Sequence, residues 1–287
     1  MANGCTSKEK ATMPFSYCLN TSTIRSEGAT ILDMIDTTAD AGWDGIEPWV
    51  KELDDWIAGG GTLDQVRARA EERNLAIVNL IGFPEWAVPE DDRRTAGFAE
   101  AARCFEMAKA LGCPHVAAPP FGIHDRVVDI LPVADHFADL VDLAAKSGVS
   151  PLLEYWGIAQ TLGRTGEVLL VAAECGRSGV QLLADVFHMY KGSGHHVGFE
   201  HFGNRRLGLV HVNDYPATPA RADITDADRV YPGDGLAPWQ QIISSLKSTG
   251  FTGMLSLELF NESYWARGPA AVAREGLAKL KGCVGTD

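Results

Sequence analysis

The sequence predicts a single (β/α)8 barrel, and three observations support this prediction. Short apolar segments recur along the chain, about 25–45 residues apart. The stretches between them place apolar side chains at helical spacing, and several end in a glycine, a residue typical of helix ends. Nearly continuous apolar strands that alternate with helices indicate a parallel sheet, and about eight such units in about 270 residues suit a closed barrel.

The expected strands follow one another in chain order. They are Phe15–Leu19, Gly45–Ile46 with Glu47, Leu75–Ile81, His115–Ala118, Leu152–Tyr155, Val180–Val186, Leu207–Val212 and Met254–Phe260. Between the first two, Ile31 and Met34 share one helical face, and residues 98–108 and 127–143 show similar spacing. An open, doubly wound sheet is the alternative. The loop after the first strand, residues 18–23, lacks the glycine-rich phosphate-binding pattern of that fold.

One domain accounts for nearly the whole chain. No internal linker or low-complexity stretch divides it, so we expect a flexible N-terminal segment over residues 1–13 and a barrel over residues 14–287. The longest irregular stretch, residues 214–237, follows the seventh strand. It is too long for a plain connection, which favours a loop of the active site.

Charge and cysteine content exclude several classes of protein. With 25 Lys and Arg against 38 Asp and Glu, the formal net charge is −13, which argues against binding to nucleic acid or to an anionic membrane. The six cysteines show no metal-finger spacing, and a core of this size needs no disulfides. No signal peptide or transmembrane segment is expected, so a reducing, cytoplasmic location is the default prediction.

Ionisable residues stand where the later apolar strands end. Glu154, Asp185, His211 and Glu258 lie at or near the ends of the fifth to eighth strands. The carboxyl ends of barrel strands form the active-site face, so these side chains are expected to converge. No Lys or Arg stands at those ends to pair with buried carboxylates, which are costly without a partner. One divalent metal ion (Mn, Co, Mg or Zn) satisfies such a set most simply.

These residues belong to motifs that resemble a known family. The motifs are Gly45-Ile-Glu47-Pro, Leu153-Glu154, Asp185-Val-Phe-His188, Val210-His211-Val-Asn-Asp214, Arg229-Val-Tyr-Pro-Gly-Asp-Gly235 and Leu257-Glu258. The chain resembles the xylose-isomerase-like TIM-barrel superfamily over about residues 14–282, within the sugar phosphate isomerase/epimerase branch. That branch includes ketose 3-epimerases, hydroxypyruvate isomerases and inosose dehydratases. Many members pair as dimers or tetramers, so the resemblance also implies a homo-oligomer as one state of this chain.

The resemblance implies a role for each residue. Glu154, Asp185, His211 and Glu258 would be the metal ligands, and His188 and Arg229 would hold substrate oxygens. Isomerising or epimerising a sugar requires removal of a proton from the carbon beside a carbonyl, and a divalent ion stabilises the resulting enediolate. Glu154 and Glu258 are the expected acid and base, with His188 as a further catalytic residue.

Other residues leave alternatives open. Glu47 is either a base near the site or an ion-pair partner of Arg25 or Lys51. Lys191 points either into the barrel mouth, as a substrate contact, or into solvent. Trp156 belongs to a group of aromatic residues near the strand ends that suits a sugar or polyol pocket, together with Tyr17, Trp49, Phe83, Trp86, Phe121 and Phe260. His195 and His196 are expected in a solvated turn.

Three other functions compete with the isomerase or epimerase. A lyase or dehydratase acting on a keto-sugar or inosose would use the same enolate, with His188, Lys191 or Asp234 as the general acid. A nuclease of the AP-endonuclease type would need several more histidines, and none occurs before His115. A sugar-binding barrel without catalysis would keep the pocket alone. The absence of a glycine-rich phosphate loop or a Lys/Arg cluster favours an unphosphorylated small-molecule sugar or keto-sugar substrate.

Overall fold

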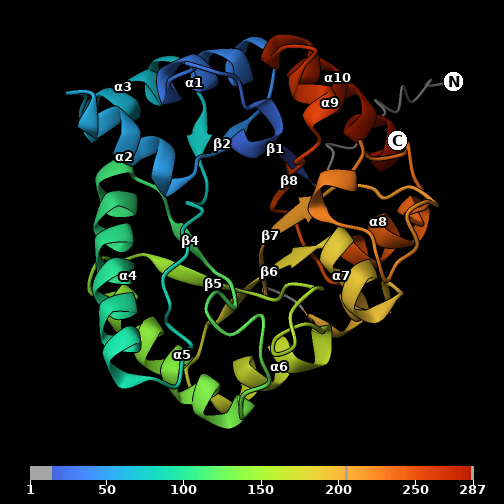
Figure 1. Ribbon diagram of the computed structural model, residues 1–287. Coiled ribbons are helices and arrows are strands. Elements are labelled where there is room, and N and C mark those ends of the chain that lie inside the picture. The colour runs from blue at the N-terminus through green and yellow to red at the C-terminus, as the bar shows by residue number, and fades with distance from the viewer. Residues whose placement is uncertain (1–14, 204–205, 286–287) are drawn as a thin grey trace, which may run out of the picture.

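Eight parallel strands form a closed ring with helices around its outside (Figure 1). A computed structural model describes residues 15–203 and 206–285, so the expected N-terminal segment 1–13 lies outside the described residues. The strands are β1 Ser16–Asn20, β2 Gly45–Glu47, β3 Ala76–Ile77, β4 His115–Ala118, β5 Ser150–Glu154, β6 Gln181–Asp185, β7 Leu207–Val212 and β8 Met254–Leu257. Their order around the sheet is β3-β2-β1-β8-β7-β6-β5-β4. This sequential order confirms the barrel and excludes the doubly wound sheet.

The expected third strand is the least regular. Only Ala76–Ile77 is regular strand, whereas the apolar run from 75 to 81 predicted a longer one. The chain still closes the ring, because a parallel bridge joins Leu80 to Val116 of β4. Leu80 N donates to His115 O at 3.1 Å, and Leu80 O accepts from Ala117 N at 2.9 Å.

Ten α-helices are described, and most of them alternate with the strands. They are α1 Ile31–Asp40, α2 Val50–Ala58, α3 Leu63–Glu72, α4 Asp91–Leu111, α5 Ile130–Ala145, α6 Thr165–Glu174, α7 Val186–Ser193, α8 Trp239–Ser248, α9 Glu262–Trp265 and α10 Pro269–Val284. Local chemistry sets their ends: Thr30 and Asp33 form a capping box at the start of α1, and Gly112, at φ 68°, ends α4. None of the described helices is long and apolar enough to cross a membrane.

Two apolar layers hold the barrel together. The larger one lies between sheet and helices and includes Met34 and Phe105. The smaller one fills the ring and consists of Cys18, Val78, Ile81, Ala117, Leu152, Leu183 and Leu209. The five described cysteines, Cys18, Cys104, Cys113, Cys175 and Cys283, are all free thiols.

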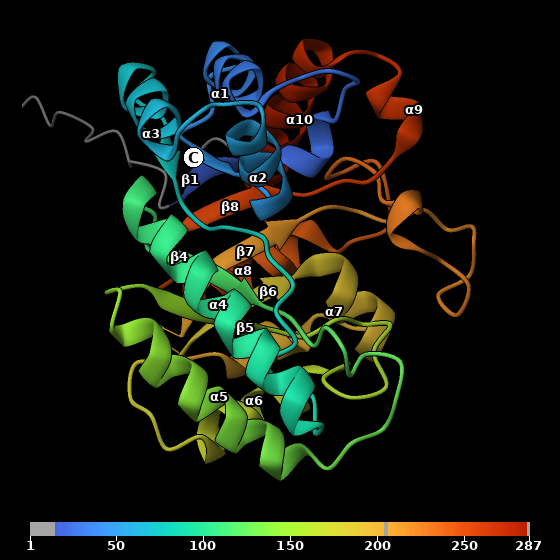
Figure 2. The same ribbon diagram turned by 60° about the vertical axis from the view of Figure 1, so that its left-hand side comes forward.

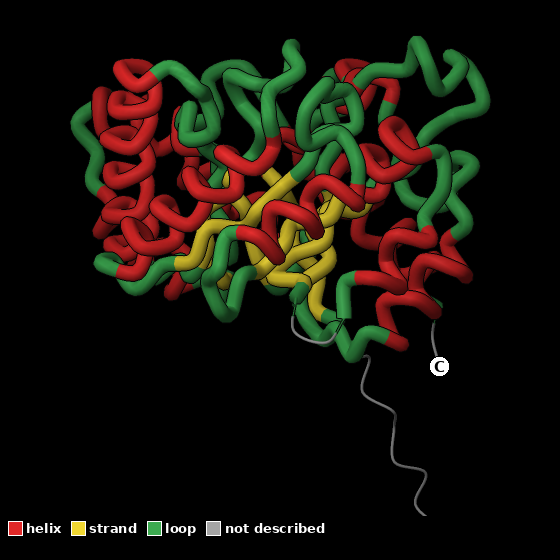
Figure 3. Tube along the Cα trace, turned by 90° about the horizontal axis from the view of Figure 1, so that it is seen from below, coloured by secondary structure: helices red, strands yellow, loops and turns green. Residues whose placement is uncertain are grey.

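The inner layer forms the floor of the candidate site. Side chains alternate along a strand, so residues two apart point the same way. Leu152, Leu183 and Leu209 fill the ring, and each is followed two positions later by Glu154, Asp185 or His211. The polar residues therefore form the next layer towards the carboxyl ends of the strands. Figure 2 shows the ring from the side, and Figure 3 shows the loops that crowd one end of it.

Candidate active site

Strand pairing places the polar residues side by side. Asp185 of β6 is in register with His211 of β7, and His211 is in register with Ser256 of β8. On the other side of β8, Asn20 of β1 is in register with Glu47 of β2. All of these side chains are buried. The pairing thus brings residues that are far apart in the sequence into one layer.

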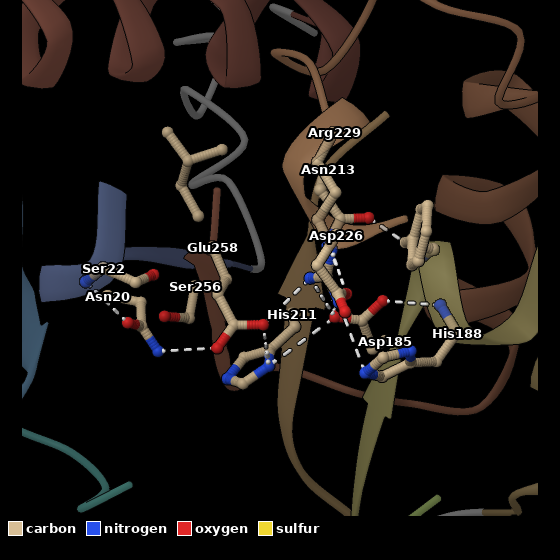
Figure 4. A network of polar contacts seen from close by, with 12 residues as sticks. Asn20, Ser22, Asp185, His188, His211, Asn213, Asp226, Arg229, Ser256 and Glu258 are labelled. Atoms are coloured by element: carbon tan, nitrogen blue, oxygen red, sulfur yellow. Dashed lines mark hydrogen bonds and ion pairs between the residues drawn. The ribbon is translucent and has the colours of Figure 1, made fainter. Parts of the chain in front are cut away.

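Three of the predicted metal ligands form a cluster. Asp185, His211 and Glu258 each offer one ligand atom, and these atoms lie within 4.8 Å of one another. His211 Nδ1 is 3.2 Å from Glu258 Oε2 and 3.7 Å from Asp185 Oδ2. Figure 4 shows the three side chains turned towards one another. The geometry is therefore that of a potential three-residue metal site.

Glu47 contacts the His211 imidazole on its Nε2 side, away from Asp185 and Glu258. Both of its carboxylate oxygens lie 2.9 Å from His211 Nε2, and it also accepts hydrogen bonds from Asn20, Asn79 and Ser256. Burial alone would raise the pKa of Glu47, but His211, with help from Asn79 and Ser256, brings this pKa below its ordinary value. Because a carboxylate can only accept, His211 Nε2 donates, and Nδ1 faces Asp185 and Glu258.

The cluster favours positive charge. Burial opposes a charge on His211, yet Glu258 and Glu47 raise the pKa of this imidazole well above its ordinary value. Arg229 supplies a second cationic group, since its Nη1 donates to Asp185 Oδ2 and to Glu258 Oε2, both at 2.9 Å. The sequence places no Lys or Arg at these strand ends, and buried carboxylates without such a partner were the reason to expect a metal ion. The structure supplies a cationic partner from elsewhere, because the loop after β7 carries Arg229 over the strand ends.

Arg229 is itself fully engaged by the protein. Its Nε and Nη2 donate to Asp226 Oδ1 at 3.0 and 2.5 Å, and Nη2 lies 3.3 Å from His188 Nε2. The guanidinium lies over the ring of Phe187, 4.6 Å from its centroid. All three nitrogens therefore have protein partners, and the substrate-anchoring role that the resemblance implied for Arg229 stays a prediction.

Glu154 and His188 complete the polar wall. Burial raises the pKa of Glu154 well above its ordinary value, and neighbouring carboxylates add to this although His211 opposes it. Within the described residues no hydrogen bond reaches the Glu154 carboxyl group. Burial lowers the pKa of His188, and Asp185 only partly offsets it. Its backbone N–H donates to Asp185 Oδ1 at 2.8 Å, while its Nδ1 is buried without a hydrogen-bond partner.

These residues open into a cavity of about 410 Å3. That volume lies in the range of small-molecule sites, about 300–1,000 Å3. Its polar lining includes Glu154, His188, His211, Arg229 and Glu258. Its apolar lining consists of Trp49, Ile81, Phe83, Trp156, Ile158, Ala227, Phe260 and Trp265, so four of the predicted aromatic residues face it.

Two predicted contacts lie elsewhere. Glu47 does not face the cavity, and neither Arg25 nor Lys51 is its partner, since Lys51 pairs with Asp55. Lys191 donates its Nζ protons to the carbonyl oxygens of Ala222 and Ile224, at 2.7 and 2.8 Å, outside the cavity. It ties α7 to the long loop instead of pointing into the barrel mouth.

The expectation of a solvated His195–His196 pair is half wrong. His195 is exposed, but His196 is buried, with Nε2 3.1 Å from Val186 O and its ring stacked on Tyr215. The second histidine therefore belongs to the packing beneath α7.

Sequence reasoning overlooked the amides and hydroxyls of this layer. Asn20 donates to Glu47 and to Glu258, at 2.9 and 3.1 Å, and Asn213 donates to Asp185 at 3.1 Å. Asn20 stands at the end of the first strand, where a search extended to amides could have found it. Asp226 gave no such signal, because it lies in the irregular loop.

Comparison with known proteins agrees with this architecture. A family described as xylose isomerase-like TIM barrel matches residues 35–283. The chain belongs to this family. The sequence-based resemblance is thereby confirmed, and so is the expected sugar isomerase/epimerase branch of the family.

Family members that resemble the chain carry two kinds of name. An inosose isomerase of Halalkalibacterium halodurans is 28% identical over 71% of this chain and 73% of its own length. A 3-dehydroshikimate dehydratase of Pseudomonas putida is 24% identical over 89% of this chain, which spans 40% of that longer protein. A solved structure of a protein named IOLI, with a bound zinc atom, matches at a TM-score of 0.86 and 21% identity, over 94% of this chain and 98% of that one. This protein, as a member of the family, is an enzyme.

Proposed function

We propose that this enzyme is a divalent-metal-dependent isomerase or epimerase of a sugar, acting by proton abstraction beside a carbonyl. One observation carries the proposal: two carboxyl groups, Glu154 and Glu258, line the same aromatic cavity, and Glu258 also belongs to the three-residue cluster that favours positive charge. A lyase or dehydratase uses the same first step and is treated as the second candidate.

The residues present fit a divalent ion. Asp185, His211 and Glu258 supply two carboxylates and an imidazole whose buried Nδ1 makes no hydrogen bond. Glu154 stands beside them as the proposed fourth ligand. Arg229 donates to Asp185 Oδ2 and Glu258 Oε2, so a divalent ion would compete with it for these two oxygens. The bound ion would act as a Lewis acid towards the substrate oxygens and lower the cost of the enediolate.

The side chains around the cavity have separate proposed roles in proton transfer and substrate binding. Glu154 and Glu258 are the proposed proton carriers, one removing the proton beside the carbonyl and the other returning it. His188 is held by its backbone bond to Asp185 and by Arg229, so its ring is fixed beside the cavity. The aromatic walls displace water from the reacting carbon and suit the C–H faces of a sugar.

A dehydratase is favoured by one further observation. Loss of a hydroxyl group needs a general acid, and His188 has a buried Nδ1 without a protein partner. The other two acids that the sequence offered are engaged elsewhere: Asp234 pairs with Lys279, and Lys191 binds backbone carbonyls. The dehydratase named among the relatives supports this second candidate.

Isotope exchange separates the two reactions. The metal-loaded enzyme is incubated in deuterated water with ketoses, inososes and 3-dehydroshikimate. Deuterium in a product of unchanged composition supports the isomerase or epimerase, whereas loss of water supports the dehydratase. Glu258→Gln should abolish either reaction, and Glu174→Gln, at an exposed position of α6 outside the cavity lining, is the control. If none of these substrates reacts in the presence of Mn, Co, Mg or Zn, both proposed reactions are contradicted. If metal analysis finds several bound zinc ions per chain, the nuclease is favoured instead.

A further inference from the structure

Arg25 lines the same cavity, and in the described part of the chain neither a hydrogen bond nor an ion pair joins it to the metal cluster. It follows the short 3-10 helix η1 Thr21–Ile24 and is half-buried. Its guanidinium carbon lies 4.6 Å from the ring centroid of Trp49 and 5.6 Å from those of Phe260 and Trp265. Three aromatic rings therefore hold this cation in place.

Those rings are themselves anchored. Trp49 Nε1 donates to Asn20 Oδ1, and Trp265 Nε1 donates to Ser22 O, both at 2.9 Å. Phe260 meets Trp49 edge-on, with the centroids 5.9 Å apart. The rings around Arg25 thus come from the segments after β2 and β8, and acceptors in β1 and η1 hold the two tryptophan rings in place.

The guanidinium keeps its donors available. Over residues 15–203 and 206–285, Arg25 makes neither a hydrogen bond nor an ion pair. The nearby Glu52 attracts Arg25 through its charge but forms no ion pair with it, and its Oε2 accepts from Thr21 Oγ1 at 2.7 Å and from Trp49 N at 3.0 Å. Aromatic rings contact the faces of a guanidinium and leave its N–H edge free to bind in the plane. Arg229, the other cavity arginine, has every nitrogen engaged.

We propose that Arg25 is a specificity-determining residue that receives one carboxylate group of the substrate. This deepens the proposed function by naming the substrate class, a keto-polyol or keto-cyclitol that carries a single carboxylate. The planar edge of one guanidinium matches one carboxylate in a paired hydrogen bond. A phosphate offers more oxygens and charge than one arginine satisfies, and Asp226 and Glu262 in the same lining oppose a dianion.

Binding of unreactive probes tests this assignment without turnover. The probes are quinate, a ring polyol with one carboxylate, and myo-inositol, a neutral ring polyol, titrated calorimetrically into the Mn-loaded enzyme. Quinate should bind about tenfold or more tightly than myo-inositol, since hydrogen bonds to charged groups are the strong ones. Arg25→Met should lower the affinity for quinate about 10–100-fold and change the affinity for myo-inositol by less than about twofold.

Two further variants keep the result interpretable. Arg25→Lys keeps the charge but loses the planar edge, so it should fall between the wild type and Arg25→Met. Arg177→Met, which breaks an exposed pair with Asp142, is the matched control and should leave both affinities unchanged. Thermal unfolding checks that each variant is folded.

Three outcomes overturn the assignment. The first is equal affinity of the wild type for the two probes. The second is an equal loss of affinity for both probes in Arg25→Met, and the third is binding of neither probe at millimolar concentration. Because no reaction is measured, a failed isotope exchange with intact quinate selectivity rejects the proposed reaction alone. Intact exchange without selectivity rejects the role of Arg25 alone.

Discussion

The contact between Glu47 and His211 links two strands that are not neighbours. Glu47 ends β2 and His211 lies in β7, so the contact crosses the interior of the ring. A carboxylate behind an imidazole fixes which nitrogen carries the proton and how the ring is turned. Glu47 thus acts on the cluster through His211 although it does not line the cavity, and we regard it as a positioning residue.

Glu47→Gln tests that role. The amide group turns at least one acceptor into a donor that faces Asn20, Asn79, Ser256 or His211, so His211 should lose its orientation. We expect metal affinity to fall about 10–100-fold, as measured by Mn titration. Unfolding free energy should fall by about 2 kcal/mol, because buried donors lose their partner.

The control for this variant is Glu71→Gln, an exposed position on the outside of the barrel. It should change neither quantity. Unchanged metal affinity in folded Glu47→Gln contradicts the positioning role, whatever happens to stability.

At the scale of elements, one buried carboxylate organises the loop from 214 to 237. Asp214 Oδ1 accepts from Tyr215 N and Ala237 N, both at 2.8 Å, and its Oδ2 accepts from Gly233 N and Trp239 Nε1, both at 2.9 Å. Its backbone pairs with Val230. The loop therefore folds around this side chain, and in doing so it carries Arg229 into the site.

Asp214→Asn should loosen the loop. An amide keeps the shape but points a donor at one pair of N–H groups, which costs about 3 kcal/mol of unfolding free energy in this buried position. Activity should fall with it, since Arg229 is placed by the same loop. Urea unfolding and turnover measure the two effects. Asp223→Asn, exposed in the same loop, should match the wild type in both, and an equal effect at both positions contradicts the argument.

His196 makes the packing beneath α7 sensitive to pH. Burial lowers the pKa of this imidazole, although its hydrogen bond to Val186 O partly offsets the effect. The unfolded chain, with a histidine pKa of about 6.5, then binds the proton more readily than the folded chain. The contribution of His196 to stability is therefore full above about pH 6.5 and declines as the pH falls through that value towards the folded-state pKa.

His196→Gln should flatten this dependence. Gln can donate to Val186 O but takes up no proton, so the loss of unfolding free energy between pH 7.5 and 5.5 should be smaller than in the wild type. Part of the slope should remain, because burial also lowers the pKa of His115 and of His136. The exposed neighbour offers the control, since His195→Gln should keep the wild-type slope. Identical slopes in both variants rule out the role of His196.

At the scale of the molecule, the spacing of apolar residues predicted the repeated alternation of strands and helices. The ends of the apolar runs identified the positions of Glu154, Asp185, His211 and Glu258, and the ring order follows from short right-handed connections between neighbours. The contact of Glu47 with His211 escaped prediction because it spans 164 residues and depends on how the ring closes.

Irregular segments account for the rest of the differences. The long loop has no apolar period, so although its motif implied that Arg229 reaches the site, the pairing of Arg229 with Asp185 and Glu258 had no signal in the sequence. His196 was misjudged for a similar reason, because its burial depends on the stacking of Tyr215 from that loop. A homo-oligomer, a cytoplasmic location and the choice of metal stay predictions.

Metal binding should stabilise the whole barrel, because the ligands come from three neighbouring strand ends. Asp185, His211 and Glu258 join β6, β7 and β8, so an ion held between them is lost when the ring opens. A ligand that binds only the folded state at a hundred times its Kd adds about 2.7 kcal/mol. For a chain of this length that amounts to a rise in Tm of about 5 °C. Differential scanning calorimetry with and without Mn measures it.

Asp185→Asn should remove that rise. Asn keeps the cap of α7, since its side-chain oxygen can still accept from His188 N, but it lacks the charge that binds a cation. Its metal-free Tm should therefore stay closer to the wild type than that of Asp185→Ala, while Mn should shift it by less than about 1 °C. The exposed Asp92→Asn should keep the full wild-type shift. A shift of equal size in Asp185→Asn means that the ion binds elsewhere, because no other role of Asp185 makes the stabilisation depend on Mn.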